Sequence, residues 1–397
     1  MNITIVSRHF NMSGGGGSTY SLNLLCSHLS DKGHEVKLYV TEPRDLPENT
    51  DYEILTTPDS DRLGRSSIQI AKEVYKTLDR LSDFTDIFHI FNPTLLPVAG
   101  LYKRRNPEIV IVGRLNTYTT FCTNQSMMNG TCHKNCSIRD KFNHEENSLE
   151  GKVSRLPLYA TRTYLDPKLM NNLDAFFALS PAVKDIYTDV GIRDDLISVI
   201  PNAYDSSFQE SDDSVDFSPE SFTVLYAGRL IKPKGVDVLL EAVTHLDDTS
   251  RVHVDIVGDG SQKDELVTRS SDLGIEDSVQ FHGRVPHDEL PEYYVKADVF
   301  VHPGRWPEPF GRTILEALQN DCPPVVSNIG GPPWIIGDAG FTFERENPVS
   351  LSNRLSTLRD NPEVLAEKAE RCSHRVEQFS PESVINSIIE EYRRCLD

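Results

Sequence analysis

Short runs of β-branched and aromatic residues alternate with helical stretches through most of the chain. In the first half the runs fall at residues 3–6, 36–40, 87–90, 109–112, 175–179 and 197–200, with helical spacing between them, as at 66–81. Strands that are apolar on both faces must be covered by helices on both sides of a parallel sheet. The pattern therefore predicts a doubly wound α/β domain.

The alternation begins again after an acidic segment. Residues 201–219 are polar and aperiodic, which is typical of a linker. Further strands are expected beyond it, at 222–228, 252–257, 279–281, 299–301, 324–327 and 341–343. At 397 residues the chain is longer than one core usually serves. We expect an N-terminal domain at 1–203, a linker at 204–220, a second domain at 221–378 and a terminal helix at 379–397.

The charge balance excludes one class of partner. The chain has 40 Lys and Arg residues against 60 Asp and Glu residues, a net charge of −20. A surface this acidic repels nucleic acid, so we expect no nucleic-acid partner. It also suits a salt-rich cytoplasm, in which charge repulsion is screened, and a halophilic source is therefore a hypothesis.

The sequence contains no segment that predicts a membrane span or a secretory signal. The first residues, MNITIVSRHF, lack a basic start followed by a long apolar run. No later run reaches the roughly 18 apolar residues that cross a bilayer. We expect a cytoplasmic protein, with peripheral contact on the inner face of the membrane as the alternative. Such contact would use a set of basic residues in the first half of the chain. The alternative is that these residues form a solvated helix face. They are Arg62, Arg65, Lys72, Lys76, Arg80, Lys103, Arg104 and Arg105.

A basic loop follows the first strand of the second half. In LYAGRLIKPKGVDVLLEA, Arg229 comes directly after the strand and Lys234 stands just before a helix. A diphosphate binds well where positive charge lies near a helix N-terminus, because the backbone N–H groups and the helix dipole add to the attraction. Both residues are candidate phosphate ligands. The alternative is a solvated loop with two ordinary basic residues.

Two glutamates follow a later strand of the same half. In HPGRWPEPFGRTILEALQ, Glu308 lies in a proline-rich turn and Glu316 comes eight positions later. Gly311 is expected to open a helix, so the N–H groups of Phe310, Gly311 and Arg312 would point toward a ligand. Carboxylates accept hydrogen bonds from vicinal hydroxyls, so the pair could hold a ribose and a hexose. A helix cap and a surface acid are the alternative.

The pair Glu308 and Glu316, with Phe310-Gly311 between them, resembles the E-x7-E signature of glycosyltransferase family 4. The segments SPAVKD, VIPNAYD, AGRLIKPKG, DIVGDG, GRVPHDELPEYYVKADVFVHP and VVSNIGGPP also follow in the order of that family's blocks. The resemblance implies the GT-B fold, in which two Rossmann-like domains face a central cleft and the last helix crosses back to the first domain. It implies a retaining enzyme that moves a hexose from a UDP- or GDP-sugar to a glycan, a lipid-linked acceptor or a small acceptor, with no metal ion or other cofactor.

The same resemblance implies roles for individual residues. Arg229 and Lys234 would neutralise the donor diphosphate, Glu308 would contact the donor sugar, and these three are the catalytic candidates. Glu316 would accept hydrogen bonds from the ribose hydroxyls. The glycine-rich turn at 14–17 matches a family loop near the donor phosphate, although a plain flexible turn is its alternative. The further donor-binding candidates are Gly15, Gly16, Gly17, Arg284, Val285, Phe310, Gly311, Arg312 and Thr313.

Some positions depart from the family pattern or stay open. Asn116 stands where many relatives carry a histidine, and Trp334 stands where they often carry an acid. A cysteine-rich segment could bind zinc, form a disulfide or remain a reduced loop, and we assign no metal to it. Its candidate ligands are Cys122, Cys132, His133 and Cys136.

Two other functions remain open for the same residues. A nucleotide-sugar epimerase on this fold would act on the donor alone. A protein that binds nucleotide sugars without turning them over would tolerate the departures at Asn116 and Trp334, although the intact set of Arg229, Lys234, Glu308 and Glu316 argues against it.

Overall fold

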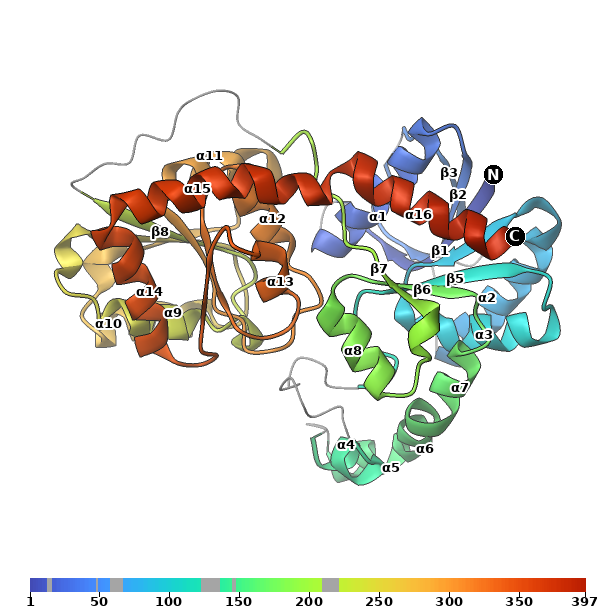
Figure 1. Cartoon of the computed structure of the whole chain (residues 1–397). Coiled ribbons are helices and arrows are strands. Elements are labelled where there is room, and N and C mark those ends of the chain that lie inside the picture. Colours follow the sequence, from blue (N-terminus) through green and yellow to red (C-terminus); the bar gives the residue numbers. More distant parts are fainter. Residues whose placement is uncertain (13–15, 48, 58–66, 123–135, 145–147, 209–220) are drawn as a thin grey trace. The chain divides into compact units, whose positions relative to one another are not determined.

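The computed structural model describes residues 1–12, 16–47, 49–57, 67–122, 136–144, 148–208 and 221–397. The chain divides into two compact units, each built on one parallel sheet (Figure 1). Unit 1 comprises Met1–Ala203 together with Pro381–Asp397, and unit 2 comprises Tyr204–Ser380. The first unit is therefore discontinuous in sequence, whereas the second is one continuous stretch.

The sheet of unit 1 has seven strands in the order β3-β2-β1-β4-β5-β6-β7, and its neighbouring strands pair in parallel. The order reverses between β1 and β4, which is the topological switch point of a doubly wound fold. Strand β3 was not expected, because its four residues lie in a polar stretch and are only partly buried. The strands are β1 (Asn2–Phe10), β2 (Glu35–Pro43), β3 (Glu53–Thr56), β4 (Ile87–Ile90), β5 (Val110–Leu115), β6 (Ala175–Ala178) and β7 (Ile197–Val199).

Helices connect these strands and supply the apolar layers on the sheet. Ser180 begins one of them as an N-cap, because its side chain accepts a hydrogen bond from the Val183 backbone N–H. The sequence predicted no elements between β5 and β6, where the described residues form four short α-helices. The helices of unit 1 before β7 are α1 (Gly16–Asp31), α2 (Ser67–Leu81), α3 (Leu96–Arg105), α4 (Ile138–His144), α5 (Leu149–Ser154), α6 (Leu156–Ala160), α7 (Asp166–Met170) and α8 (Pro181–Asp189).

The last helix, α16 (Pro381–Leu396), belongs to the core of unit 1. Its buried residues recur every three or four positions, so they form one apolar face. At its end the Tyr392 hydroxyl lies 2.6 Å from His89 Nδ1 on β4. Burial and the nearby Arg114 guanidinium lower the pKa of His89 well below its usual value. The return of the chain to its first domain, expected from the resemblance, is thus present.

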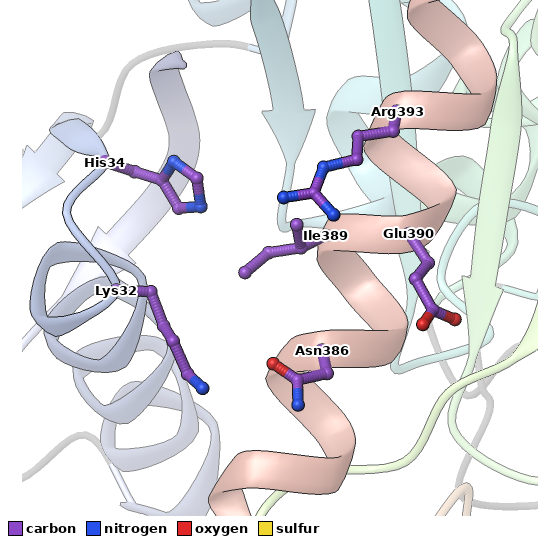
Figure 2. A pocket seen from close by; sticks show the side chains of 6 residues that line it. All are labelled: Lys32, His34, Asn386, Ile389, Glu390 and Arg393. Carbon is purple, nitrogen blue, oxygen red and sulfur yellow. The ribbon is translucent and has the colours of Figure 1, made fainter.

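A cavity of about 220 Å³ lies beside α16 (Figure 2). Lys32 and His34, from the turn between α1 and β2, face Arg393 of α16 across it, and Ile389 lies between them. Burial and the positive charges of the N-terminal amine and Arg393 lower the pKa of His34. None of the residues singled out from the sequence lines this cavity.

The sheet of unit 2 has six strands in the order β10-β9-β8-β11-β12-β13, again with parallel neighbours. Numbered from β8, this is the 3-2-1-4-5-6 order of dinucleotide-binding sheets. The switch point lies between β8 and β11. The strands are β8 (Phe222–Ala227), β9 (Val252–Val257), β10 (Val279–Gly283), β11 (Val299–His302), β12 (Pro324–Ser327) and β13 (Phe341–Phe343).

Helices surround this second sheet, and a core of Val, Leu, Ile, Phe and Tyr side chains fills the space between the layers. The expected class, two doubly wound α/β domains, is therefore confirmed. Within the described parts of both units, no helix combines the length and the apolar composition required to cross a membrane. The helices of unit 2 are α9 (Val236–Val243), α10 (Lys263–Asp272), α11 (Leu290–Lys296), α12 (Arg312–Gln319), α13 (Pro332–Ile336), α14 (Pro348–Asp360) and α15 (Pro362–Val376).

The first residues of the expected linker differ from the prediction. Residues 204–208 belong to unit 2, and Tyr204, Asp205 and Phe208 pack against it while Ser206 and Ser207 are exposed. The Tyr204 N–H donates to the carbonyl of Phe379, and the Gln319 side chain donates to the carbonyl of Asp205 at 2.7 Å. Phe208 is buried against the rings of His287 and Tyr294. The remaining linker residues, 209–220, lie outside the described residues.

Candidate active site

The candidate residues of unit 2 lie at the carboxyl edge of its sheet, on both sides of the switch point. The loop after β8 carries Arg229 and Lys234, and the loop after β11 carries Glu308. Because β8 and β11 are neighbouring parallel strands, both loops leave the same edge of the sheet. Open α/β sheets bind their ligands at such an edge.

Lys234 and Glu308 form a partly buried ion pair at this edge. Lys234 Nζ lies 2.8 Å from Glu308 Oε1 and 2.6 Å from Oε2, and the two side chains are 15% and 16% exposed. Glu308 Oε2 has a second partner, His302 Nε2, at 3.0 Å. Burial alone would raise the pKa of Glu308, but Lys234 and His302 outweigh it and hold this pKa well below the usual value. Glu308 is therefore a carboxylate at neutral pH.

Close backbone contacts fix the loop after β11 against the loops after β8 and β12. Gly235 has φ +69°, and a Cβ there would lie 2.1 Å from the carbonyl oxygen of Pro303. Gly330 has φ +74°, and a Cβ there would lie 2.7 Å from the backbone nitrogen of Glu308. Only glycine combines this conformation with so close an approach. Close backbone packing therefore fixes the main chain next to both Lys234 and Glu308.

A bidentate ion pair between Arg305 and Asp237 also holds the loops after β8 and β11 together. Arg305 donates from its two terminal nitrogens to the carboxylate oxygens of Asp237 on α9, both at 2.6 Å. Its backbone N–H donates to the carbonyl of Pro233 at 2.8 Å. Arginine and carboxylate are matched in this planar geometry. Arg305 therefore connects the loop after β11 to the start of the helix that follows Lys234.

Glu316 lies on α12 with its side chain directed into a polar, buried setting. The residue is 5% exposed, and the Tyr294 hydroxyl donates to its Oε2 at 3.0 Å. His287 Nε2 and Arg312 Nε lie 3.6 and 3.9 Å from its Oε1. Burial, and after it the charge of Glu316, raise the pKa of Tyr294 well above its usual value, so the phenol remains a donor. A carboxylate oxygen can accept more than one hydrogen bond, so Glu316 can also receive a ligand hydroxyl.

The start of α12 places backbone groups between the two glutamates. Gly311 is the N-cap with φ +118°, so the helix begins at Arg312, as the sequence predicts. Phe310 is buried and packs edge-on against Phe379, 6.0 Å between ring centroids. Thr313 lies in the first turn of the helix and is half-buried. The first N–H groups of a helix have no partner within it and can receive an anion.

Arg229 and the pair Arg284 and Val285 lie at other points of the same edge. Arg229 is exposed directly after β8, and its carbonyl accepts a hydrogen bond from the buried Tyr226 hydroxyl at 2.9 Å. Within the described residues, no hydrogen bond or ion pair engages its guanidinium. Arg284 and Val285 follow β10, two strands from β8 and so about 10 Å away along the edge. This spacing separates them from the Lys234–Glu308 pair.

Several further candidates lie in unit 1 or outside the described residues. Gly16 and Gly17 are exposed at the first residues of α1, and Gly16 has φ +62°, whereas Gly15 lies outside the described residues. Asn116 follows β5, where its amide donates to the carbonyl of Phe91 at 3.1 Å and its buried Oδ1 has no partner within the described residues.

The structure describes only part of the cysteine cluster. Cys132 and His133 lie outside the described residues, while Cys122 and Cys136 lie within them. Within the described ranges, no three His, Cys, Asp or Glu side chains gather as they would around a metal ion. The metal, disulfide and thiol interpretations of the cluster stay predictions.

Trp334 takes part in a small aromatic cluster. Its ring stands edge-on to Phe379 at 5.6 Å, and the Arg375 guanidinium lies 5.8 Å from the Trp334 ring centroid and 5.1 Å from that of Phe379. The tryptophan side chain therefore packs against unit 2 itself.

The comparisons with known proteins agree with this arrangement. The model of "Glycosyl transferases group 1" matches residues 207–379, and the model of "Glycosyltransferase Family 4" matches residues 15–208. Together they extend over both units. The chain belongs to glycosyltransferase family 4.

One curated relative and one solved structure illustrate what this family 4 chain is similar to. Mannosylfructose-phosphate synthase of Agrobacterium fabrum is 33% identical over 180 residues, which are 41% of this chain and 39% of that protein. The match thus spans about two fifths of the relative's length. Among solved structures, HepE of Anabaena in complex with UDP superimposes with a TM-score of 0.72 at 20% identity and covers 99% of this chain and all of that one.

A second solved structure shows the same GT-B fold. Sucrose-phosphate synthase of Thermosynechococcus elongatus has a TM-score of 0.76 at 16% identity and covers 99% of this family 4 chain and 98% of its own. At these identities the likeness establishes the fold alone. The substrates must therefore be argued from the residues of this chain.

Sequence reasoning missed three residues that support the site of this family 4 protein. His302, Tyr294 and Arg305 contact Glu308, Glu316 and Asp237 respectively. The signals were weak, because His302 looks like the last residue of an apolar strand, and Tyr294 lies on a helix that gave no reason to expect a glutamate partner. Arg305 follows His302 by three residues and could have been placed at the sheet edge.

Proposed function

We propose that the protein transfers a hexose from a nucleoside-diphosphate sugar to a saccharide, lipid-linked or small acceptor. The observation that carries the proposal is the contact of Lys234 with Glu308 at the switch point of unit 2. It places one ammonium group beside one carboxylate where the ligand of such a sheet binds. A diphosphate requires the first group, and sugar hydroxyls require the second.

The ion pair leaves capacity for both parts of a donor. An ammonium group has three N–H donors, and the two contacts with Glu308 engage two of them. The third can reach a phosphate oxygen. Each carboxylate oxygen accepts more than one hydrogen bond, so Glu308 can also receive a sugar hydroxyl. Donor binding therefore does not require the pair to break.

The same groups suit the departure of the nucleoside diphosphate. As the bond from the sugar to the phosphate breaks, negative charge grows on the terminal phosphate. Lys234, Arg229 and the N–H groups that begin α12 would stabilise this charge more in the transition state than in the ground state. We propose attack of the acceptor on the same face of the sugar, so that the anomeric configuration is retained, without a metal ion or other cofactor.

Support for the donor class comes from both the site and a neighbour. Glu316 offers a buried carboxylate eight residues beyond Glu308, and a carboxylate can accept hydrogen bonds from ribose hydroxyls. HepE, which shares the fold, was solved with UDP and with UDP-glucose. We therefore propose UDP-sugars as the first donors to test and GDP-sugars as the second. We further propose that unit 1 binds the acceptor and that the enzyme is cytoplasmic.

Donor turnover tests the proposal. The protein is incubated with UDP-, GDP- and ADP-sugars, with and without EDTA and with mixed acceptors, and release of nucleoside diphosphate is measured. Glu316→Gln should lower kcat/KM for the accepted donor by about 10- to 100-fold, the loss of a charged hydrogen bond of about 1.5–3 kcal/mol. Glu370→Gln, at an exposed position on α15, is the matched control and should leave kcat/KM unchanged.

Each outcome has a distinct meaning. Transfer that survives EDTA and gives a product of the donor's anomeric configuration, read by NMR, supports the full proposal. Conversion of the donor to its epimer without an acceptor would instead identify an epimerase. Tight donor binding with no release under any acceptor mixture would contradict catalysis and identify a binding protein.

A further inference from the structure

His302 is a buried histidine whose ring contacts a proposed catalytic carboxylate. It is the last residue of β11, its side chain is 2% exposed, and its Nε2 lies 3.0 Å from Glu308 Oε2. A carboxylate only accepts hydrogen bonds, so the ring must donate from Nε2. Its Nδ1 is buried and has no partner within the described residues. The single hydrogen bond to Glu308 is therefore the polar contact that the structure gives this ring.

The backbone below the ring is shaped for it. A Cβ at Gly304 would lie 3.0 Å from His302 Cε1 and 3.4 Å from Nδ1, tighter than ordinary contact. The Gly304 carbonyl accepts a hydrogen bond from Ser327 Oγ at 2.6 Å, which fixes this turn to the end of β12. The imidazole thus occupies a space that exists because residue 304 has no side chain, and its position is set by two neighbouring strands.

The two groups that hold Glu308 differ in side-chain length and in the place where they join the backbone. Lys234 reaches Glu308 from a loop on a long flexible side chain, and the same ammonium group is the one that a donor diphosphate attracts. His302 reaches it from within the sheet on a short, buried side chain. When the third N–H of Lys234 engages phosphate, the ammonium group is shared between the phosphate and Glu308, whereas the contact of His302 belongs to Glu308 alone.

We propose that His302 is a positioning residue that keeps the Glu308 carboxylate oriented toward the donor sugar while Lys234 engages the diphosphate. This inference rests on the proposed function, because it assigns Glu308 to the sugar. It assigns no contact between His302 and the substrate. The role is specific to the sugar half of the donor, so the nucleoside diphosphate alone should not depend on it.

Variants of His302 separate this role from simple packing. His302→Leu fills the space without a donor, whereas His302→Gln places an amide N–H near the position of Nε2. We expect kcat for donor turnover to fall by about 10- to 100-fold in His302→Leu, because small misplacements of catalytic groups cost that much. Affinity for UDP alone should stay within about twofold, and His302→Gln should recover most of kcat. His253→Leu, at an exposed position on β9, is the control and should change neither.

Gly304→Ala offers a second route that leaves the histidine in place. Its Cβ should displace the ring from Glu308 and reproduce part of the kcat loss, again with UDP affinity unchanged. The inference is overturned if His302→Leu retains kcat, if it loses UDP affinity as much as kcat, or if His302→Gln is no better than His302→Leu.

A donor-free measurement keeps this test distinct from that of the proposed function. In selectively ¹³C-labelled protein, the pKa of the Glu308 carboxyl should rise in His302→Leu and less in His302→Gln, since the histidine contact lowers it. A wild-type protein that turns over no donor contradicts the proposed function alone. An unchanged Glu308 pKa in His302→Leu overturns the inference even if the enzyme is active.

Discussion

Removing the ammonium group of Lys234 should destabilise unit 2 through the carboxylate that it leaves behind. In Lys234→Met the apolar part of the side chain is retained, but the carboxylate of Glu308 stays partly buried. Among the side chains of the described residues, His302 is then its one remaining polar partner. Breaking one half of a buried ion pair costs about 3–5 kcal/mol. We expect the lower end, about 3 kcal/mol, because the pair is 15–16% exposed and the histidine contact remains. For a domain of this size that corresponds to a decrease in melting temperature of about 6–12 °C.

The dependence of this loss on pH identifies its cause. In the wild type the pKa of folded Glu308 is below that of the unfolded chain, so the stabilisation is present at neutral pH and is lost only as the pH falls through the low folded value. In Lys234→Met burial should raise the folded pKa, and acid should then protonate the group and relieve the penalty. Thermal unfolding at pH 7.5 and 4.5 measures this, and the difference between variant and wild type should shrink in acid. Lys234→Met combined with Glu308→Gln should recover stability at pH 7.5. A difference that does not change with pH, together with a double variant no more stable than the single one, would refute the reasoning.

Two further substitutions test the supporting structure. Arg305→Lys removes the bidentate contact with Asp237 and should destabilise unit 2 by about 1–2 kcal/mol, seen as a lower urea midpoint at constant m-value; an unchanged midpoint would show that the contact contributes nothing. Phe208→Ala should cost about 3–5 kcal/mol in thermal unfolding, because the ring is 2% exposed and contacts His287 and Tyr294. A cost below about 1 kcal/mol would mean that residues 204–208 are a linker after all.

Most of the fold follows from local patterns in the sequence. The predicted strands at 87–90, 252–257, 324–327 and 341–343 match the observed strands residue for residue, because each is a short run rich in β-branched and aromatic residues. The misses have physical causes. Strand β3 has only four residues and lies in a polar stretch. It is held by its pairing with β2, a contact that no local pattern reports. Phe208 sits in a run of acids and serines, so composition hides its burial.

The candidate site is predicted less completely than the fold. Parallel strands bring their carboxyl ends to one edge, so Lys234 and Glu308 could be expected near each other from strand order alone. Their direct ion pair could not, because it depends on the approach of Gly235 to Pro303 and of Gly330 to Glu308. Likewise, no spacing in the sequence connects Tyr294 to Glu316, which lie on different helices.

The discontinuity of unit 1 has a consequence for biosynthesis. The ribosome makes residues 1–203 first, but their core includes Val384, Ile388 and Tyr392 of α16. Unit 2 is one uninterrupted stretch and is made in between. The N-terminal half must therefore wait on the ribosome with an apolar surface uncovered while the later half is synthesised and can already fold. Unit 2 can therefore finish folding before unit 1, although unit 1 begins the chain. We expect the nascent N-terminal half to be the form that most needs a chaperone.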